Sequence, residues 1–122
     1  MLHARDLMAV FESEEQVANL APDFSRIAGL EEFAVIVTAP GRDVDFVSRF
    51  FAPKAGINED PVTGSAHCTL APYWSAQLGK ARLHAHQLSA RGGELVCEIR
   101  DSRVVISGRA VEYLRGQILI DE

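Results

Sequence analysis

The sequence has no cluster of basic residues and no apolar run long enough to span a membrane. Its 12 lysines and arginines are scattered singly and are outnumbered by 17 acidic residues, which gives a net charge of -5. Nucleic-acid-binding proteins gather basic residues on one face, so we expect no nucleic-acid partner. The N-terminus shows no signal-peptide pattern either. We therefore expect a cytoplasmic protein without a membrane partner.

Cysteine is also scarce. The two cysteines, Cys68 and Cys97, have no CxxC spacing, so the sequence predicts no zinc site, and no disulfide is expected in a reducing compartment. We interpret both as small core residues. His84 and His86 lie two apart on one strand, but a third metal ligand is not evident, so we interpret them as surface or interface residues.

Apolar residues, in contrast, are abundant, and the chain has no repeats and no linker. Hydrophobic residues make up 48% of the sequence, which is enough for the core of one globular domain over residues 1–122. The stretch from Ala66 to Leu78 is small or apolar on nearly every side and predicts a buried helix. Pro72 predicts a kink or break in it, near Leu70 to Ala71.

The residues around this helix supply start and stop signals. Asp60 and Thr63 are candidate N-caps, Pro61 could be the first helical residue, and Gly79 predicts the end.

Shorter segments on either side predict a sheet. Ser13 and Gln16 match a capping box, which indicates a helix over 14–20, and a second helix is expected over 23–30. Alternating segments predict strands over 7–11, 33–38, 45–52, 82–90, 94–100 and 103–107, and a last strand over 110–114 and 117–120, bent by a bulge at Gly116. This order predicts an α+β fold in which an antiparallel-rich sheet curls around one buried central helix.

The start of the central helix could bind an anion. The first backbone N–H groups of a helix have no intrahelical partner, so Gly64, Ser65 and Ala66 could bind a carboxylate or phosphate, and Asp60 beside them could serve as a general acid or base. The alternative interpretation is that Asp60 and Thr63 only cap the helix and Ser65 only completes a turn.

Two further residues allow both a functional and a structural interpretation. His67, in the first turn, could hydrogen-bond a ligand or act as a base, or it could only close a polar network at the helix end. Arg91, before Gly92 and Gly93, could clamp a carboxylate or be a solvated hairpin residue.

Several motifs carry a resemblance to a known family. They read NEDPVTGSAHC at 58–68, APYW at 71–74, QLSARGGEL at 87–95 and VISG at 105–108, preceded by FVSRFFAP at 46–53. Together they resemble the C-terminal half of the phenazine-biosynthesis PhzF-like isomerases. The resemblance implies half of a diaminopimelate epimerase-like fold, in which two domains each wrap a sheet around a helix and the active site lies between them.

The resemblance also implies which residues line the site and which part of it is missing. It implies no cofactor and no metal, and it places Asp60, Gly64 and Ser65 at the site. The family's catalytic glutamate belongs to an N-terminal domain, which we expect to be absent here, and Glu59 occupies a motif position without that role. Cys68 and Cys97 are not a good substitute for the thiol pair of related racemases.

We therefore expect an isomerase or epimerase domain that moves a proton on a small carboxylic acid without a cofactor. Asp60 is the predicted catalytic residue, and Gly64, Ser65, Ala66 and His67 are the predicted substrate-binding residues. The partners expected are a small-molecule carboxylate and either a separate N-terminal domain or further copies of the chain.

Two alternatives remain. One is a non-catalytic module for small-carboxylate binding or dimerisation. The other is a hotdog-type thioesterase, which also wraps a sheet around a helix, although the motif from Asp60 to Ser65 argues against it.

Overall fold

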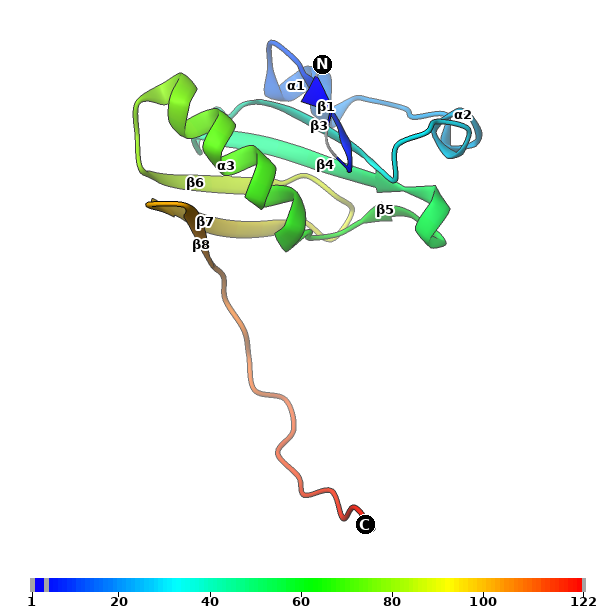
Figure 1. Cartoon of the computed structure of the whole chain (residues 1–122), viewed down its shortest axis with the longest axis vertical. Helices are drawn as coiled ribbons and strands as arrows, with labels where there is room; N and C mark the ends of the chain where they lie inside the picture. The colour runs from blue at the N-terminus through cyan, green and yellow to red at the C-terminus, as the bar shows by residue number, and fades with distance from the viewer. Residues whose placement is uncertain (1, 4, 122) are drawn as a thin grey trace.

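The computed structural model describes residues 2–3 and 5–121, and within them one mixed sheet forms the body of the molecule (Figure 1). Its eight strands follow the order β1-β2-β3-β4-β6-β7-β8, with β5 paired to β4. Only the pairs β2–β3 and β4–β6 are parallel among these described strands. The predicted antiparallel-rich α+β fold is thus confirmed. The strands are β1 (Leu2–His3), β2 (Leu7–Val10), β3 (Val35–Pro40), β4 (Phe46–Ala52), β5 (Ile57–Asp60), β6 (Arg82–Gln87), β7 (Gly93–Arg100) and β8 (Arg103–Ser107).

The helices are α1 (Glu14–Ala18), α2 (Phe24–Ala28), the 3-10 helix η1 (Pro53–Ala55) and α3 (Gly64–Leu78). Helix α1 begins where the sequence predicted, and α2 begins one residue later than predicted. The capping box of α1 is confirmed, because Ser13 Oγ accepts from the backbone N–H of Gln16 at 3.3 Å and Gln16 Oε1 accepts from that of Ser13 at 3.2 Å. In the part of the chain that the structure describes, no helix is both long and apolar enough to cross a bilayer.

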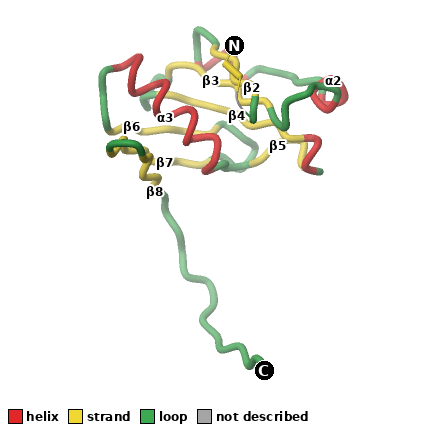
Figure 2. Tube along the Cα trace, in the orientation of Figure 1, coloured by secondary structure: helices red, strands yellow, loops and turns green. Residues whose placement is uncertain are grey.

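Helices pack on both faces of the sheet (Figures 1 and 2). On one face, α3 covers a core of aromatic and aliphatic side chains that includes Phe46, Phe50, Leu83, Leu95 and its own Trp74. On the other face, α1 and α2 cover a second core around β3 and β4 that includes Val17, Val37, Val47 and Phe51, with Phe24 and Ile27 packed against it.

The long helix α3 is buried on one side only. Its buried residues are Ala66, His67, Leu70, Ala71 and Trp74, while Cys68 and Pro72 on the opposite side are exposed. The expectation of a helix buried on every side is therefore wrong, because the described sheet covers a single helix face. The interpretation of Cys68 as a core residue is wrong for the same reason.

The ends of α3 partly follow the prediction. Thr63 occupies the N-cap position, Pro61 lies outside the helix, and Gly79 ends it with a left-handed φ of 64°, a conformation that glycine adopts without strain. The helix continues through Pro72 without the predicted break. Because Pro72 lies on the exposed side, solvent can reach the carbonyl group that lost its hydrogen bond.

The predicted last strand over 110–120 is wrong. Residues 108–121 leave the end of β8 as an extended segment without a strand partner in the described chain, and it runs away from the body (Figure 1). The alternating apolar pattern is present in the sequence. A strand also needs a neighbouring strand to hydrogen-bond its backbone groups, and the described sheet ends at β8.

Asp45 ties the end of α3 to the sheet. Its Oδ1 accepts a hydrogen bond from Lys80 Nζ at 2.6 Å, and its Oδ2 accepts one from the backbone N–H of His84 at 2.8 Å. Burial raises the pKa of the Asp45 carboxyl, but the hydrogen bonds and charge of these neighbours lower it by more. The net pKa lies below the ordinary aspartate value.

We expect Asp45→Asn to remove part of the acid sensitivity of folding. The folded-state pKa of Asp45 is lowered, so its stabilisation is present above the unfolded pKa of about 4 and is lost as the pH falls through the folded value. At neutral pH the variant should lose about 1 kcal/mol, and the difference from wild type should shrink below about pH 4. Thermal unfolding across this pH range measures it. The exposed Asp43→Asn is the control, and equal behaviour of the two variants would contradict the prediction.

Candidate functional site

The motif that begins at Asn58 lies on a strand–turn–helix junction. Residues Ile57–Asp60 form β5, which pairs antiparallel with β4 so that Glu59 lies opposite Phe51 and Asp60 opposite Phe50. Helix α3 starts at Gly64, so only three residues separate it from the end of β5. The motif is therefore held by the sheet on one side and by the helix on the other.

Glu59 forms an ion pair with Arg49. Arg49 Nε lies 2.8 Å from Glu59 Oε1, and Arg49 Nη2 lies 3.0 Å from Oε2, a bidentate arrangement. The same guanidinium donates to the carbonyl groups of Val17 and Leu20 and lies over the Phe51 ring. Both carboxylate oxygens of Glu59 thus serve to join β5 to β4 and α1.

Asp60 faces the helix start instead. The Thr63 hydroxyl donates to Asp60 Oδ2 at 2.5 Å, so Thr63 turns toward this carboxylate and makes no side-chain cap to α3. The expectation that Asp60 or Thr63 caps the helix with its side chain is therefore wrong. The first-turn N–H groups of α3 have no side-chain cap among the described residues.

A buried glutamine fixes the turn between β5 and α3. Gln87, at the end of β6 and fully buried, accepts a hydrogen bond from the Thr63 backbone N–H at 2.8 Å. Its Nε2 donates to the Asp60 carbonyl at 2.9 Å and to Thr63 Oγ1 at 3.1 Å. Every polar atom of this side chain is used on the turn, which sets the backbone position of Asp60.

The loop after β6 also holds the turn. Ser89 Oγ donates to the Pro61 carbonyl and accepts from the Gly92 N–H, both at 2.9 Å. Gly93 packs so closely that a Cβ there would lie 2.0 Å from Val62 Cγ2. The sequence did not predict a role for Gln87, Ser89 or Gly93 individually. The family-like motif at 87–95, which contains all three, is the sequence feature that points to them.

His67 lies beneath the helix start rather than at its open end. The ring is fully buried against Phe46, and Nδ1 lies 2.7 Å from the Thr63 carbonyl oxygen. A carbonyl only accepts, so Nδ1 carries the proton and Nε2, which has no partner in the described structure, does not. Burial lowers the His67 pKa, with the Thr63 hydrogen bond opposing that shift, which favours a neutral ring.

The other predicted site residues gather at one end of α3. Asp60 is half-buried, Gly64 and Ser65 are exposed, and Ala66 is buried, so Ala66 could offer only its backbone N–H. A Cβ at Gly64 would meet no atom within 4 Å, which means that the helix start faces open space. The structure thus brings Asp60, Gly64 and Ser65 together at the surface and sets His67 behind them.

A hollow of about 530 Å³ lies beside the motif. Of the motif residues, only Val62 lines it, and the charged groups around it are Arg91, Glu94 and Arg109. Arg91 is exposed there.

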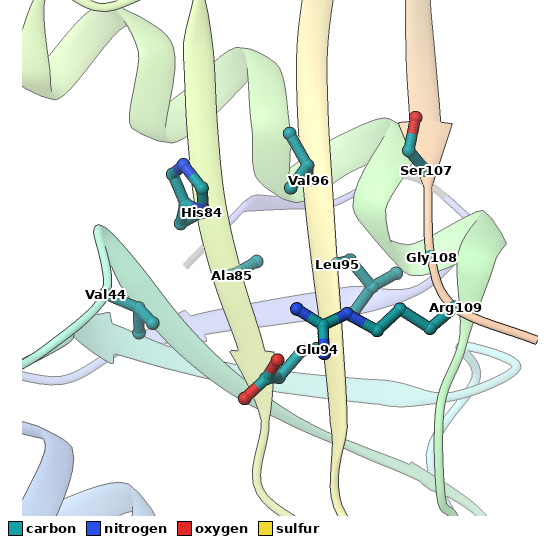
Figure 3. Close-up of a pocket in the computed structure, with 9 residues that line it drawn as sticks. All are labelled: Val44, His84, Ala85, Glu94, Leu95, Val96, Ser107, Gly108 and Arg109. Carbon is teal, nitrogen blue, oxygen red and sulfur yellow. The ribbon is translucent and has the colours of Figure 1, made fainter.

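A second hollow, of about 370 Å³, lies on the face of β6, β7 and β8 turned away from α3 (Figure 3). His84, Val96 and Ser107 project on this side, with α3 behind the strands. Within residues 2–3 and 5–121, no three His, Cys, Asp or Glu side chains are grouped as a metal site requires.

The two cysteines differ in environment. Cys97 is buried and Cys68 exposed, and both are free thiols. Burial, and secondarily Cys68, raises the pKa of Cys97 to about 11, so its thiol is protonated at neutral pH.

Comparison with known proteins gives consistent matches. A family model described as phenazine biosynthesis-like protein matches residues 3–116. A protein named as an uncharacterized isomerase of Pseudomonas aeruginosa is 52% identical over 118 residues, which make up 97% of this chain and 46% of that protein. The chain spans a little under half the length of this protein and of other curated relatives that it matches.

Solved structures match the fold closely. A crystal structure of a putative phenazine biosynthesis PhzC/PhzF protein from Clostridium difficile has a TM-score of 0.87 and 47% identity, covering 97% of this chain and 46% of the other. A PhzF-family protein from Enterococcus faecalis has a TM-score of 0.84 and 54% identity, covering 86% and 41%. The predicted fold class is confirmed by these structures.

We expect Gln87→Leu to destabilise the fold by about 2–3 kcal/mol, because the Thr63 N–H and the Asp60 carbonyl would lose their partner in a largely buried turn. Urea unfolding measures the loss. Gln77→Leu, the same change at an exposed position of α3, should alter stability by less than about 0.5 kcal/mol. Equal effects of the two substitutions would show that the Gln87 hydrogen bonds contribute little.

Gly93→Ala should lower stability by about 1–3 kcal/mol, because its methyl group would overlap the Val62 side chain. Adding Val62→Ala should recover much of the loss, and a double-mutant cycle of melting curves measures that coupling. Gly116→Ala, where a Cβ meets no atom within 4 Å, is the control. Additive effects of the Gly93 and Val62 substitutions would argue against the contact.

Proposed function

Because the chain belongs to the phenazine biosynthesis-like PhzC/PhzF family, as its motifs predicted, we propose that it contributes half of an isomerase site acting on a small carboxylic acid. The reaction moves a proton from one position of the substrate to another and needs no cofactor. The observation that carries the proposal is the uncapped start of α3, where the Thr63 hydroxyl donates to the Asp60 carboxyl and Gln87 donates to the Asp60 backbone carbonyl.

In this proposal the substrate carboxylate binds at the start of α3. The N–H groups of Gly64, Ser65 and Ala66 point along the helix axis toward the ligand, and the positive end of the helix dipole favours its charge. The exposed Ser65 hydroxyl adds a side-chain donor. The open space at the Gly64 Cα lets the ligand approach the backbone closely.

Asp60 then polarises the substrate or relays its proton. Its neighbour Glu59 is held by Arg49 through both oxygens, which favours Asp60 as the acid–base group of the motif. His67 acts as a positioning residue, since its bond to the Thr63 carbonyl supports the N-cap from below.

We further propose that the main base comes from the half of the family protein that this chain does not span. The curated relatives it matches are about twice as long, and several are named isomerases. Association with that complementary half in the cytoplasm would complete the site. No match supports a hotdog-type thioesterase, and a non-catalytic binding module is an outcome of the tests below.

Titration of the chain with benzoate, followed by amide NMR, tests the binding step. The Gly64, Ser65 and Ala66 signals should shift, and Ser65→Ala should weaken binding by about 3–10-fold through the loss of one hydrogen bond. Ser75→Ala, the same change near the other end of α3, should not. If benzoate left these amides unmoved, the anion site would be rejected.

Asp60→Asn tests the chemical step. The chain is mixed with the separately produced complementary half of the P. aeruginosa isomerase, and small amino and hydroxy acids are screened for solvent deuterium incorporated at carbon. The substitution keeps an acceptor for the Thr63 hydroxyl yet should lower exchange by about 10²–10⁴-fold. Full exchange in Asp60→Asn would exclude Asp60 as the proton-transfer group. Benzoate binding without exchange in any mixture would favour a binding module.

A further inference from the structure

The hollow of about 370 Å³ on the face of β6, β7 and β8 turned away from α3, hereafter the outer hollow, is distinct from the candidate site. Neither Asp60 nor the start of α3 lines it, and α3 lies behind the strands in Figure 3. Pockets that bind small molecules have volumes of about 300–1,000 Å³. The outer hollow is therefore a second candidate site for a small ligand.

Strand alternation brings the side chains of the outer hollow to one sheet face. On β7, Leu95 belongs to the core under α3, so its neighbours Glu94 and Val96 face the opposite side. His84 on β6 and Ser107 on β8 both lie directly opposite Val96 in the sheet, and they project on this side as well. Three adjacent strands thus contribute to one surface.

Two opposite charges meet at one end of the outer hollow. Glu94 lies near the start of β7, and Arg109 follows the end of β8 by two residues. Their side chains point toward one another in Figure 3. Both are exposed, and in the part of the chain that the structure describes neither forms an ion pair. Both charges are therefore available to a ligand.

The outer hollow also has an apolar part. Val44, in the loop before β4, and Val96 line it, and both are half-buried. The exposed His84 and Ser107 add hydrogen-bonding groups. A ligand with one small apolar group next to two charged groups would match this lining.

We propose that the outer hollow binds a small α-amino acid with an apolar side chain. The ammonium group of the ligand pairs with the Glu94 carboxylate, and its carboxylate accepts two parallel hydrogen bonds from the Arg109 guanidinium. The apolar side chain lies against Val44 and Val96. A zwitterion fits better than a simple anion or cation, because either of these would place its charge near a side chain of the same sign. This binding does not depend on the isomerase chemistry proposed above.

Titration of the chain with L-valine, followed by amide NMR, tests the site. The signals of Glu94, Val96 and Gly108 should shift, with a dissociation constant of about 1–10 mM. The affinity is modest because the charged groups are exposed, where water and salt weaken each ion pair. Added salt should therefore reduce it further.

Two analogues of valine separate the roles of its charges. Isovalerate lacks the ammonium group and isobutylamine lacks the carboxylate, while both keep the branched side chain. Each should bind about 3–10-fold more weakly than valine. Glu94→Gln should weaken valine binding by the same factor but should not weaken isovalerate binding, since it removes an attraction in one case and a repulsion in the other. Arg109→Gln should likewise weaken binding of valine and not of isobutylamine.

Glu98→Gln and Arg103→Gln are the matched controls. They make the same changes on β7 and β8, on the same sheet face, at positions that do not line the outer hollow. Both should leave valine binding within about 2-fold of wild type. The melting temperature of each variant checks that folding is intact.

The opposite results would overturn the proposal. If Glu94 and Arg109 pair with each other instead, about 50 mM valine will leave the three amide signals unmoved. Equal losses in the variants and their controls, or an analogue that binds as tightly as valine, would also overturn it. Shifts confined to Gly64, Ser65 and Ala66 would assign valine to the start of α3 and not to the outer hollow. Benzoate binding is followed on those other signals, so either site can be rejected without the other.

Discussion

The hydrogen bonds of Gln87 to the turn between β5 and α3 hold the candidate site together. A buried amide is costly unless its donors and acceptor are all paired, and here they pair with the Asp60 carbonyl and with the N–H and hydroxyl of Thr63. Strand β6, which carries Gln87, is paired with β4 on one side and β7 on the other. The hydrogen bonds of Gln87 therefore anchor the turn between β5 and α3 to the sheet. The open amides of α3 and the carboxyl of Asp60 depend on that support.

Two adjacent carboxylates in the motif have different environments. Glu59, on β5, is bound through both oxygens to an arginine that also joins α1 and β4, which makes it part of the frame. Asp60 is one residue further on, where the strand ends, and among the described residues its carboxylate accepts a hydrogen bond only from the hydroxyl of Thr63. Strand alternation is the physical cause, because successive side chains point to opposite faces. The Glu59 carboxylate therefore stabilises the fold, whereas the Asp60 carboxylate lies near solvent.

Helix α3 and the segment after β8 expose much of their surface in the described structure. Helix α3 is covered by the sheet on one side only, its N-terminus faces solvent, and residues 108–121 extend from the sheet with their apolar side chains exposed. The curated relatives are about twice as long as this chain.

The sequence alone determined what depends on neighbours along the chain. Local order along the chain was enough to predict the capping box at Ser13, the glycine that ends α3, the strands over 94–100 and 103–107 and the family motifs. Caps and alternation act over a few residues. Only the tertiary structure decided that β5 pairs with β4, that Arg49 holds Glu59, that Gln87 reaches Thr63 and that His67 lies buried. It also decided that the segment over residues 108–121 pairs with no strand of the described chain. Such contacts join residues far apart in sequence, and no local pattern specifies them.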